Sequence, residues 1–361
     1  MSEIDPPRLC ANEVSAASNL DDGPVIELWY GESMRFGGRG WSNRWLTVPG
    51  RITCRAGLHD ARWSIRGTLQ GGPFPLGPTA YRLAGRGDFN LEIDPGGLED
   101  GVYCLRIDAV DRRQRTASRS VTLHLSFDSS PTLPWVCDWA DMPRIDAAAQ
   151  VVDGRWSIDR GSLRVEGIGY DRMVTLGSRA WTDVDVLVPV TVHGYSRDPL
   201  AYIPPSCGAL VGLVLRWDGH TNWHDLIPYR GYKPFGMMAV HLHRFAGQSR
   251  FALYDNDDQL RPAEAPPREL DLGRRYWFRA GVVSRPSGPS RYRFKAWAEG
   301  QPEPPWMCEA DGTPAERGAG SIALVAHHTD ASFGRVMVRA MGRADGGQAP
   351  SPFPFQEPPA S

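Results

Sequence analysis

The chain has 361 residues, 41% of them hydrophobic and 23% charged, with a formal net charge of −2. A charge this close to zero gives no electrostatic footprint for nucleic acid and disfavours an anionic membrane surface as partner. No apolar run reaches about 18 residues, the length that a membrane-spanning helix needs. The opening residues, MSEIDPPRLC, are polar and acidic and do not resemble a signal peptide, so we expect a cytoplasmic protein.

Short alternating polar and apolar runs between Gly and Pro turn signals predict an all-β chain. We expect residues 1–22 to be disordered and residues 23–127 to form a first domain. Its predicted strands are Val25–Tyr30, Trp45–Cys54, Ala61–Arg66, Phe89–Ile93, Val102–Val110 and Ser118–Ser126. Six or seven strands in about 100 residues are typical of an immunoglobulin-like sandwich.

One stretch of this domain, LEDGVYCLRIDAVD, places Tyr103, Leu105, Ile107 and Ala109 on one face of a strand. Its pattern, L-x-x-G-x-Y-x-L-x-I-x-A-x-D, resembles the F strand of immunoglobulin-like and cadherin-like domains. The resemblance implies an architecture and no particular function.

The six cysteines, at positions 10, 54, 104, 137, 207 and 308, form no CxxC pair, which excludes a zinc ribbon and a thioredoxin motif. Cys104 directly follows Tyr103, so it faces away from the core and is out of register for an inter-sheet disulfide with Cys54. Free thiols are the default in a cytoplasmic protein. The sequence therefore predicts no disulfide.

Residues 128–134 are a Pro/Ser linker, residues 135–342 a second domain, and residues 343–361 a disordered Pro-rich tail. A short helix is compatible only with Pro143 to Val151. The clearest strands are Gly169–Leu176, Asp183–Val192, Ala209–Trp217, Met237–His243, Arg250–Tyr254, Tyr276–Val283, Tyr292–Glu299, Ile322–His327 and Gly334–Met341. About ten such strands in roughly 200 residues predict a two-sheet jelly roll.

Several segments of the second domain resemble the concanavalin A-like lectin/glucanase superfamily, most closely its laminin-G-like bacterial modules. They include WSIDRGSLRVEG, YDRMVTLGSRAWTDVDVLVPVTV, and RYRFKAWAEGQPEPPW with Tyr292, Lys295, Trp297, Glu303, Pro304 and Trp306. The strand FGRVMV, residues 333–338, resembles the one that closes the sandwich. The resemblance implies the jelly-roll fold, which hosts lectins, glycosidases, lyases and adhesion modules.

The glucanases of this superfamily carry their paired carboxylates as E-x-D-x-x-E on one strand. Only partial matches occur here, at Glu92-Ile93-Asp94 and at Glu269-Leu270-Asp271, and neither has the third acidic residue. We interpret both as turn acids and expect no hydrolysis of β-1,3- or β-1,4-glucans.

The stretch RWDGHTNWHDLIPYRGY, residues 216–232, carries polar aromatic residues on a loop that follows a strand. Aromatic rings stack on the apolar faces of sugars, and short polar side chains bond their hydroxyls. The candidate ligand residues of this stretch are Trp217, His220, Trp223, His224 and Tyr229. The alternative, which we weigh equally, is a loop folded back on the sheet with its Trp rings in a satellite core.

Other candidate ligand residues lie on strands. His241 and His243 of HLH share one face of a strand. This face either lines a groove or, as we favour, is open to solvent. His327 ends another strand. A second candidate site, Tyr170-Asp171-Arg172, is expected to hold an ion pair between Asp171 and Arg172.

No cofactor is required by these patterns. A transition-metal site built from His220, His224 and His327 is disfavoured, because residues four apart share a face only on a helix. Calcium is the better metal candidate, with Asp255, Asp257 and Asp258 as oxygen ligands. For these aspartates we favour an Asx-rich hairpin turn.

The sequence thus predicts an immunoglobulin-like sandwich followed by a concanavalin A-like jelly roll that binds a glycan or another polar small molecule. The rival function is a glycan-active lyase or hydrolase that uses His220, His224 or His327 as acid or base. A pure interaction module is the third alternative.

If the loop is the ligand site, Trp223→Ala weakens glycan binding by about 1–3 kcal/mol and leaves the fold intact, because an exposed ring contributes to binding alone. A ring buried in the core instead costs about 3–5 kcal/mol of stability on truncation. Titration beside thermal melts separates the two outcomes. A lower melting temperature with unchanged affinity in the folded fraction would place the site elsewhere.

Overall fold

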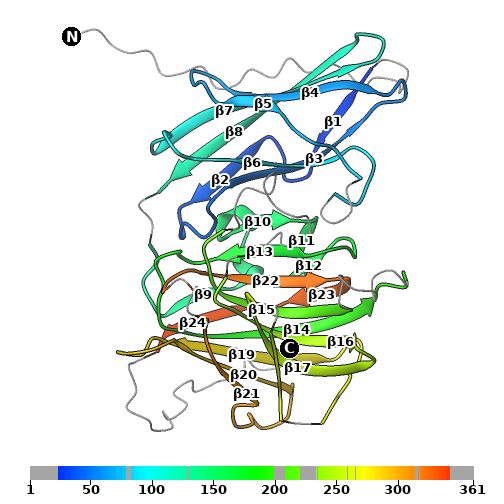
Figure 1. The fold of residues 1–361 in the computed structure, drawn as a ribbon. Helices are drawn as coiled ribbons and strands as arrows, with labels where there is room; N and C mark the ends of the chain where they lie inside the picture. Colours follow the sequence, from blue (N-terminus) through cyan, green and yellow to red (C-terminus); the bar gives the residue numbers. More distant parts are fainter. Residues whose placement is uncertain are drawn as a thin grey trace, which may run out of the picture.

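The computed structural model describes residues 23–78, 83–127, 130–198, 208–219, 233, 235–257, 259–264, 266–313, 316 and 318–341. Their regular elements are strands and two single turns of 3-10 helix, so the predicted all-β class is confirmed. Two sandwiches stack along the molecule, the first drawn in blue to teal and the second in green to red (Figure 1). Within the described residues, no helix is long and apolar enough to cross a membrane.

The first sandwich packs a three-stranded sheet, in the order β1-β3-β6, on a five-stranded sheet, β2-β8-β7-β4-β5. Strand β2 runs parallel to β8, and the other neighbours are antiparallel. The bounds are β1 Val25–Leu28, β2 Ser33–Gly37, β3 Leu46–Thr53, β4 Leu58–Ile65, β5 Gly71–Pro73, β6 Asp88–Ile93, β7 Gly101–Asp111 and β8 Thr116–Ser126. All six predicted strands are present; β2 and β5 were not predicted.

Strand β7 follows the predicted alternation. Leu105, Ile107 and Ala109 are fully buried in the core, and Tyr103 packs against it. The Tyr103 hydroxyl donates to the carbonyl of Glu99 and accepts from its N–H, at 3.1 and 2.9 Å. The eight strands establish a two-sheet sandwich, and its immunoglobulin-like assignment stays a prediction.

The expectation of six free thiols is wrong. Cys104 is disulfide-bonded, to a partner outside the described residues. Cys54, Cys137 and Cys308 are free. Cys104 does face away from the core, as the alternation of β7 predicts.

The second sandwich packs a seven-stranded sheet on a nine-stranded one around a large apolar core. The first has the order β10 Ala149–Asp153, β13 Arg172–Leu176, β22 Ser321–His327, β15 Ala209–Trp217, β16 Met237–Phe245, β17 Gln248–Asp255 and β18 Leu260–Pro262. The second has the order β11 Trp156–Asp159, β12 Ser162–Val165, β23 Thr329–Phe333, β14 Val184–Tyr195, β19 Arg275–Val283, β20 Arg291–Ala298 and β21 Cys308–Asp311, with β24 Val336–Ala340 beside β14 and β9 Trp135–Cys137 beside β24.

The short helix with which the sequence of Pro143 to Val151 is compatible does not form. Two 3-10 turns, η1 Trp139–Asp141 and η2 Ile145–Ala147, precede the edge strand β10. Residues Ala149 and Val151 alternate into the core while β10 pairs with β13, so tertiary pairing overrides a weak helical pattern.

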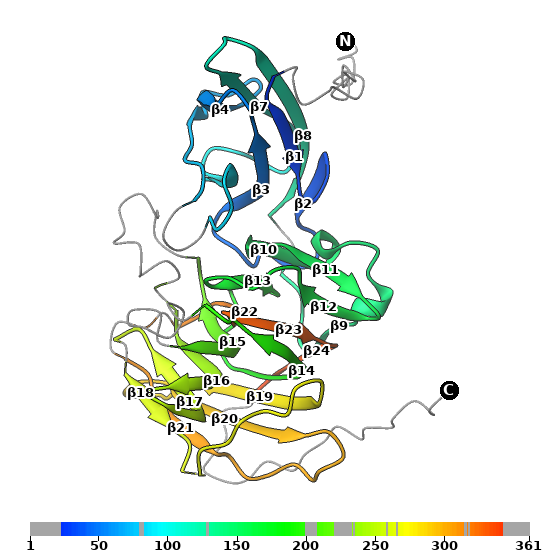
Figure 2. The ribbon, with the colours of Figure 1, turned by 90° about the vertical axis from the view of Figure 1, so that its right-hand side faces the viewer.

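The first sandwich docks on the outer face of the seven-stranded sheet, next to β10 and β13 (Figures 1 and 2). Its segment 41–47 crosses this face. The Ser42 hydroxyl lies 3.0 Å from that of Thr175, and the Ser321 hydroxyl donates to the Ser42 carbonyl at 2.6 Å. The outer face is itself apolar, with Trp217, Val325 and neighbouring side chains buried on it. The two sandwiches therefore form a continuous packed body.

A second set of contacts surrounds Tyr30, which follows β1. Its hydroxyl donates to the carbonyl of Gly154 at 3.1 Å and accepts from the N–H of Trp156 at 2.9 Å. Burial raises the pKa of this hydroxyl. The Asn90 amide donates to the Val152 carbonyl at 2.7 Å. These bonds hold β1 and β6 against the start of the second sandwich.

The linker residues 130–134 also belong to this packing. The Pro131 carbonyl accepts from the Trp181 indole at 3.0 Å, and the hydroxyls of Ser130 and Ser178 lie 3.0 Å apart. The proposed domain bounds stay a prediction.

Alkylation of the denatured, unreduced protein should label four cysteines, since two of the six are in the bridge. Mass spectrometry before and after reduction measures this directly. Six labelled thiols without reduction would contradict the Cys104 bridge.

The change Tyr30→Phe should lower the free energy of unfolding by about 1–3 kcal/mol, because two backbone groups at the junction lose their partner. Urea unfolding gives the value. The matched control is Tyr103→Phe, whose hydroxyl bonds sit at a more exposed position and should cost less than about 1 kcal/mol. Equal losses of unfolding free energy in both variants would show that the Tyr30 bonds at the junction stabilise the protein no more than the Tyr103 bonds do.

Candidate ligand site between the two sandwiches

The structure buries four of the predicted ligand residues, Trp217, His241, His243 and His327. Trp217 is fully buried in the apolar cluster on the outer face of the seven-stranded sheet, which leaves no ring face for stacking on a sugar. His241 and His243 are 0% and 6% exposed. Four other candidates, His220, Trp223, His224 and Tyr229, lie outside the described residues, so their role stays a prediction.

The solvated strand face expected for HLH is wrong. His241 and His243 share the face of β16 that points toward the other sheet. The Nε2 atom of His241 lies 2.9 Å from the carbonyl of Arg268, and the His243 ring stacks on Tyr195 of β14 with centroids 3.6 Å apart. Burial lowers the pKa of His241 to about 4 and lowers that of His243 as well. Both histidines are therefore neutral members of the core.

His327 lies at the end of β22 in a polar cluster. Its Nδ1 is 2.7 Å from a carboxylate oxygen of Asp171, and the rings of Tyr170 and His328 pack edge-on against it. The carboxylate beside Nδ1 orients the imidazole ring. Burial, reinforced by the charge of His327, lowers the pKa of His328 to about 4.

The ion pair expected between Asp171 and Arg172 is replaced by another. Arg172 pairs with Asp153 at 3.0 Å, both side chains being buried. Asp171 adopts a positive φ of 43°, which turns the chain at the start of β13, and it contacts His327. Sequence adjacency predicted the right charged groups and the wrong pairs.

The candidate calcium ligands form a turn. One Asp255 oxygen accepts from the N–H groups of Asp257 and Gln259, at 3.0 and 2.9 Å, which confirms the Asx-rich turn. Asp258 lies outside the described residues, and among the described ones no group of three His, Cys, Asp or Glu side chains could hold a metal ion. Calcium binding stays a prediction.

The partial glucanase motifs also carry turn acids. Asp94 accepts from the N–H of Gly96, and Asp271 accepts from the Tyr276 hydroxyl. Their hydrogen bonds hold chain reversals, which agrees with the interpretation from sequence.

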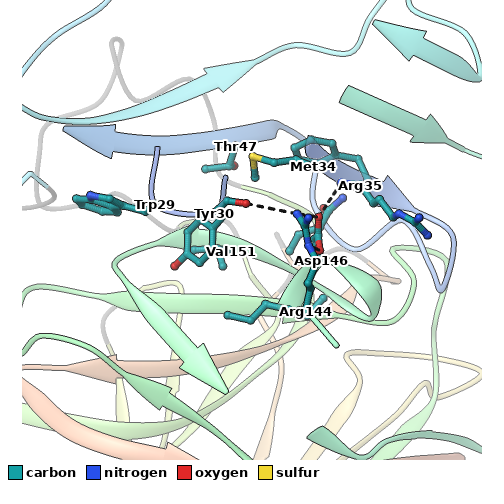
Figure 3. Close-up of a pocket in the computed structure, with 12 residues that line it drawn as sticks. Trp29, Tyr30, Met34, Arg35, Thr47, Arg144, Asp146 and Val151 are labelled. Atoms are coloured by element: carbon teal, nitrogen blue, oxygen red, sulfur yellow. Dashed lines mark hydrogen bonds and ion pairs between the residues drawn. The ribbon is translucent and has the colours of Figure 1, made fainter. Parts of the chain in front are cut away.

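Trp29 lines two hollows at the junction of the sandwiches. The first has a volume of about 330 Å³ and is shown in Figure 3; it is also lined by Tyr30, Met34, Arg35, Phe36, Thr47, Arg144, Ile145, Asp146, Ala149, Gln150 and Val151. The second measures about 360 Å³. The Trp29 side chain is half-buried, and its indole N–H donates to none of the described residues.

Hydrogen bonds fix the rim of the first hollow, called here the Trp29–Gln150 hollow. The Arg144 guanidinium bonds the carbonyls of Tyr30 and Ser33, and the N–H of Arg35 donates to Asp146 at 2.9 Å (Figure 3). These bonds join β2 to η2. The walls are therefore rigid elements of both sandwiches.

Gln150 is an unusual member of this wall. It is 5% exposed, and both atoms of its amide group are buried without a hydrogen-bond partner among the described residues. A buried polar group without a partner costs about 1–3 kcal/mol. Native structures contain few such groups, and each calls for an explanation.

The second hollow is lined by paired charges. Arg51 bonds Asp88 at 2.6 Å, and the Arg172–Asp153 pair forms another part of the wall. Asn90 lies between them, with its amide oxygen buried and without a partner among the described residues. The charges balance, so this hollow favours neutral polar groups over ions.

This site was not predicted from the sequence, because its residues come from two predicted domains. Trp29 stands at the end of a predicted strand, and Gln150 stands in the segment that is compatible with a short helix. One signal was available: adjacent Trp and Tyr residues stand at a strand end, and both residue types are enriched in binding surfaces. Nothing in the local sequence shows that Gln150 is buried.

No family model matches the chain, and no curated protein matches it. Solved structures give partial overlays. The alginate lyase Aly36B has 12% identity and a TM-score of 0.34, with 52% of this chain and 84% of that chain covered. The exoplasmic/lumenal domain of VIP36 in its Ca²⁺-bound form has 13% identity and a TM-score of 0.38, covering 57% and 87%.

A third overlay is a Bacillus subtilis protein with a galectin-like fold, at 12% identity and a TM-score of 0.32, covering 54% and 86%. The similar structures thus include a protein with a galectin-like fold and an alginate lyase. Similarity at this level assigns neither an activity nor a ligand to this chain.

Burial of His241 makes stability depend on pH. Its folded pKa of about 4 lies below the ordinary value of 6.5, so the unfolded chain binds the proton more tightly. Stability should therefore fall as the pH drops from about 6.5 to 4, by at most about 1.4 kcal/mol per pH unit for this group. Urea unfolding of His241→Gln, which keeps a donor for the Arg268 carbonyl, should show a flatter profile. If the unfolding free energy of His241→Gln changes with pH as steeply as that of the wild type, the effect does not come from His241.

Proposed function

We propose that the protein binds a glycan in the cleft between its two sandwiches and that this binding is non-catalytic. The observation that carries the proposal is the position of Trp29, half-buried between two hollows of about 330 and 360 Å³. A sugar ring stacks on indole through its apolar C–H face, while its hydroxyls bond the polar groups beside it. Both volumes lie at the small end of the range for ligand sites.

The rigidity of the cleft supports the proposal. Bonds of Tyr30, Arg144 and Asn90 fix the hollows from both sides. A preorganised site avoids the entropy cost of ordering loops when the ligand binds. Neutral polar groups, paired charges and one aromatic ring together suit an uncharged, hydroxyl-rich ligand.

One observation favours an enzyme as the second candidate. The contact of 2.7 Å between His327 and Asp171 is the arrangement that orients a histidine as general base, and Tyr170 lies beside it. Incubation with uronate-containing polysaccharides tests this function. Unsaturated products that disappear in His327→Ala and in Asp171→Asn would support a lyase.

We also propose that the protein resides in an oxidising compartment. A disulfide at Cys104 is typical of an oxidising compartment. This disfavours the cytoplasm expected from the polar N-terminal residues. Fractionation of cells that produce the protein shows in which compartment it resides.

The change Trp29→Ala should weaken glycan binding at least about tenfold and leave the melting temperature nearly unchanged, because the ring is half-exposed in the cleft. A glycan array followed by calorimetry measures the affinity. The matched control is Trp297→Ala, which removes another half-buried ring from β20, far from the cleft in Figure 1. Binding that survives Trp29→Ala and is lost in Trp223→Ala would move the site to residues 216–232.

A further inference from the structure

Gln150 is buried in the wall of the Trp29–Gln150 hollow. Its side chain is 95% buried, and its amide N–H₂ and C=O groups have no partner among the described residues. The polar neighbours are already engaged. Thr47 accepts from the Asn43 amide at 3.1 Å, and the Thr175 hydroxyl lies 3.0 Å from that of Ser42.

The surroundings of Gln150 in the Trp29–Gln150 hollow are mostly apolar. Met34 and Phe36 come from the first sandwich, and Ile145 and Val151 come from the second. A hydroxyl group placed against these side chains would lose its water without gaining a partner. The hollow therefore favours a group that combines an apolar part with a polar atom that can bond the Gln150 amide.

We propose that the Trp29–Gln150 hollow receives the acetamido group of an N-acetylated amino sugar. The methyl group packs against the apolar wall. The acetamido C=O accepts from the Gln150 N–H₂, which gives this buried donor a partner. Because the acetamido amide is trans, its N–H points away from Gln150, and the Gln150 C=O accepts from a hydroxyl of the same sugar. The sugar ring lies on Trp29, as in the proposed glycan binding on which this inference rests.

Gln150 reaches the ligand by turning its side chain. Its amide atoms are occluded in this structure, and the last torsion of Gln is soft, so the turn is inexpensive. A carboxylated sugar fits the hollow less well, because the Gln150 carbonyl oxygen would face an anion. A sugar with hydroxyls alone leaves the apolar wall uncovered.

Calorimetry with matched probes tests the proposal. We expect the β-1,4-linked trimer of N-acetylglucosamine, or an oligosaccharide with N-acetylgalactosamine, to bind at least about tenfold more tightly than its glucose or galactose counterpart. The variant Gln150→Met keeps the volume and removes the amide. It should reduce the preference to less than about twofold while the hydroxyl-only probe binds as before.

Stability gives a second readout that needs no ligand. Because Gln150→Met removes an unpartnered buried amide, its melting temperature should equal or exceed that of the wild type. The control Thr313→Val removes another unpartnered buried polar atom, distant from the cleft in sequence. It should also preserve stability, and it should leave the preference for acetylated probes intact.

Each outcome decides a separate claim. Glycan binding that depends on Trp29 but shows no preference for acetylated probes overturns the inference and leaves the proposed function standing. A preference that survives Gln150→Met also overturns it. A melting temperature several degrees lower in Gln150→Met shows that water satisfies the amide, which removes the premise. Absence of binding to any probe overturns both proposals.

Discussion

The Tyr30 hydroxyl connects the two sandwiches at the point on which the rest of the arrangement depends. It accepts from one backbone group of the second sandwich and donates to another, in a buried position. Tyr30 also places Trp29 beside it at the mouth of the cleft. Together with the bonds of Arg144 and Asp146 that join β2 to η2, this contact holds the two walls of the Trp29–Gln150 hollow in place.

This docking changes what the second sandwich can do. The outer face of its seven-stranded sheet is apolar, and segment 41–47 of the first sandwich crosses the part formed by β13 and β22. A sugar-binding surface on that part of the sheet is therefore closed. The cleft at the edge strand β10 instead places polar groups beside the half-buried ring of Trp29.

Much of the fold could be predicted from sequence, because strand alternation is a local signal. Tyr103 and Leu105 face the core as their spacing requires, and the long strands β14, β15 and β19 were predicted close to their bounds. Short edge strands such as β5 and β18 carry too few residues for a period to show. Strand β10 was not predicted, because it forms by pairing with β13, a long-range interaction that local propensity does not contain.

The site was harder to predict, because burial depends on what covers a strand. His241 and His243 alternate with apolar residues, a pattern that fits one open face, yet both faces of β16 are covered. Likewise, Asp171 and Arg172 are adjacent in sequence but find partners on other elements, His327 and Asp153. Polar residues at such positions reveal their role only when the whole packing is known.

The central claim is that the ligand site lies between the two sandwiches. Hydrogen–deuterium exchange with and without a bound glycan tests it most directly, because it reports on every peptide of the intact chain at once. The account predicts that the glycan slows exchange in peptides that cover residues 28–36 and 144–153. Protection confined to residues 216–232, with no change at the junction, would contradict it.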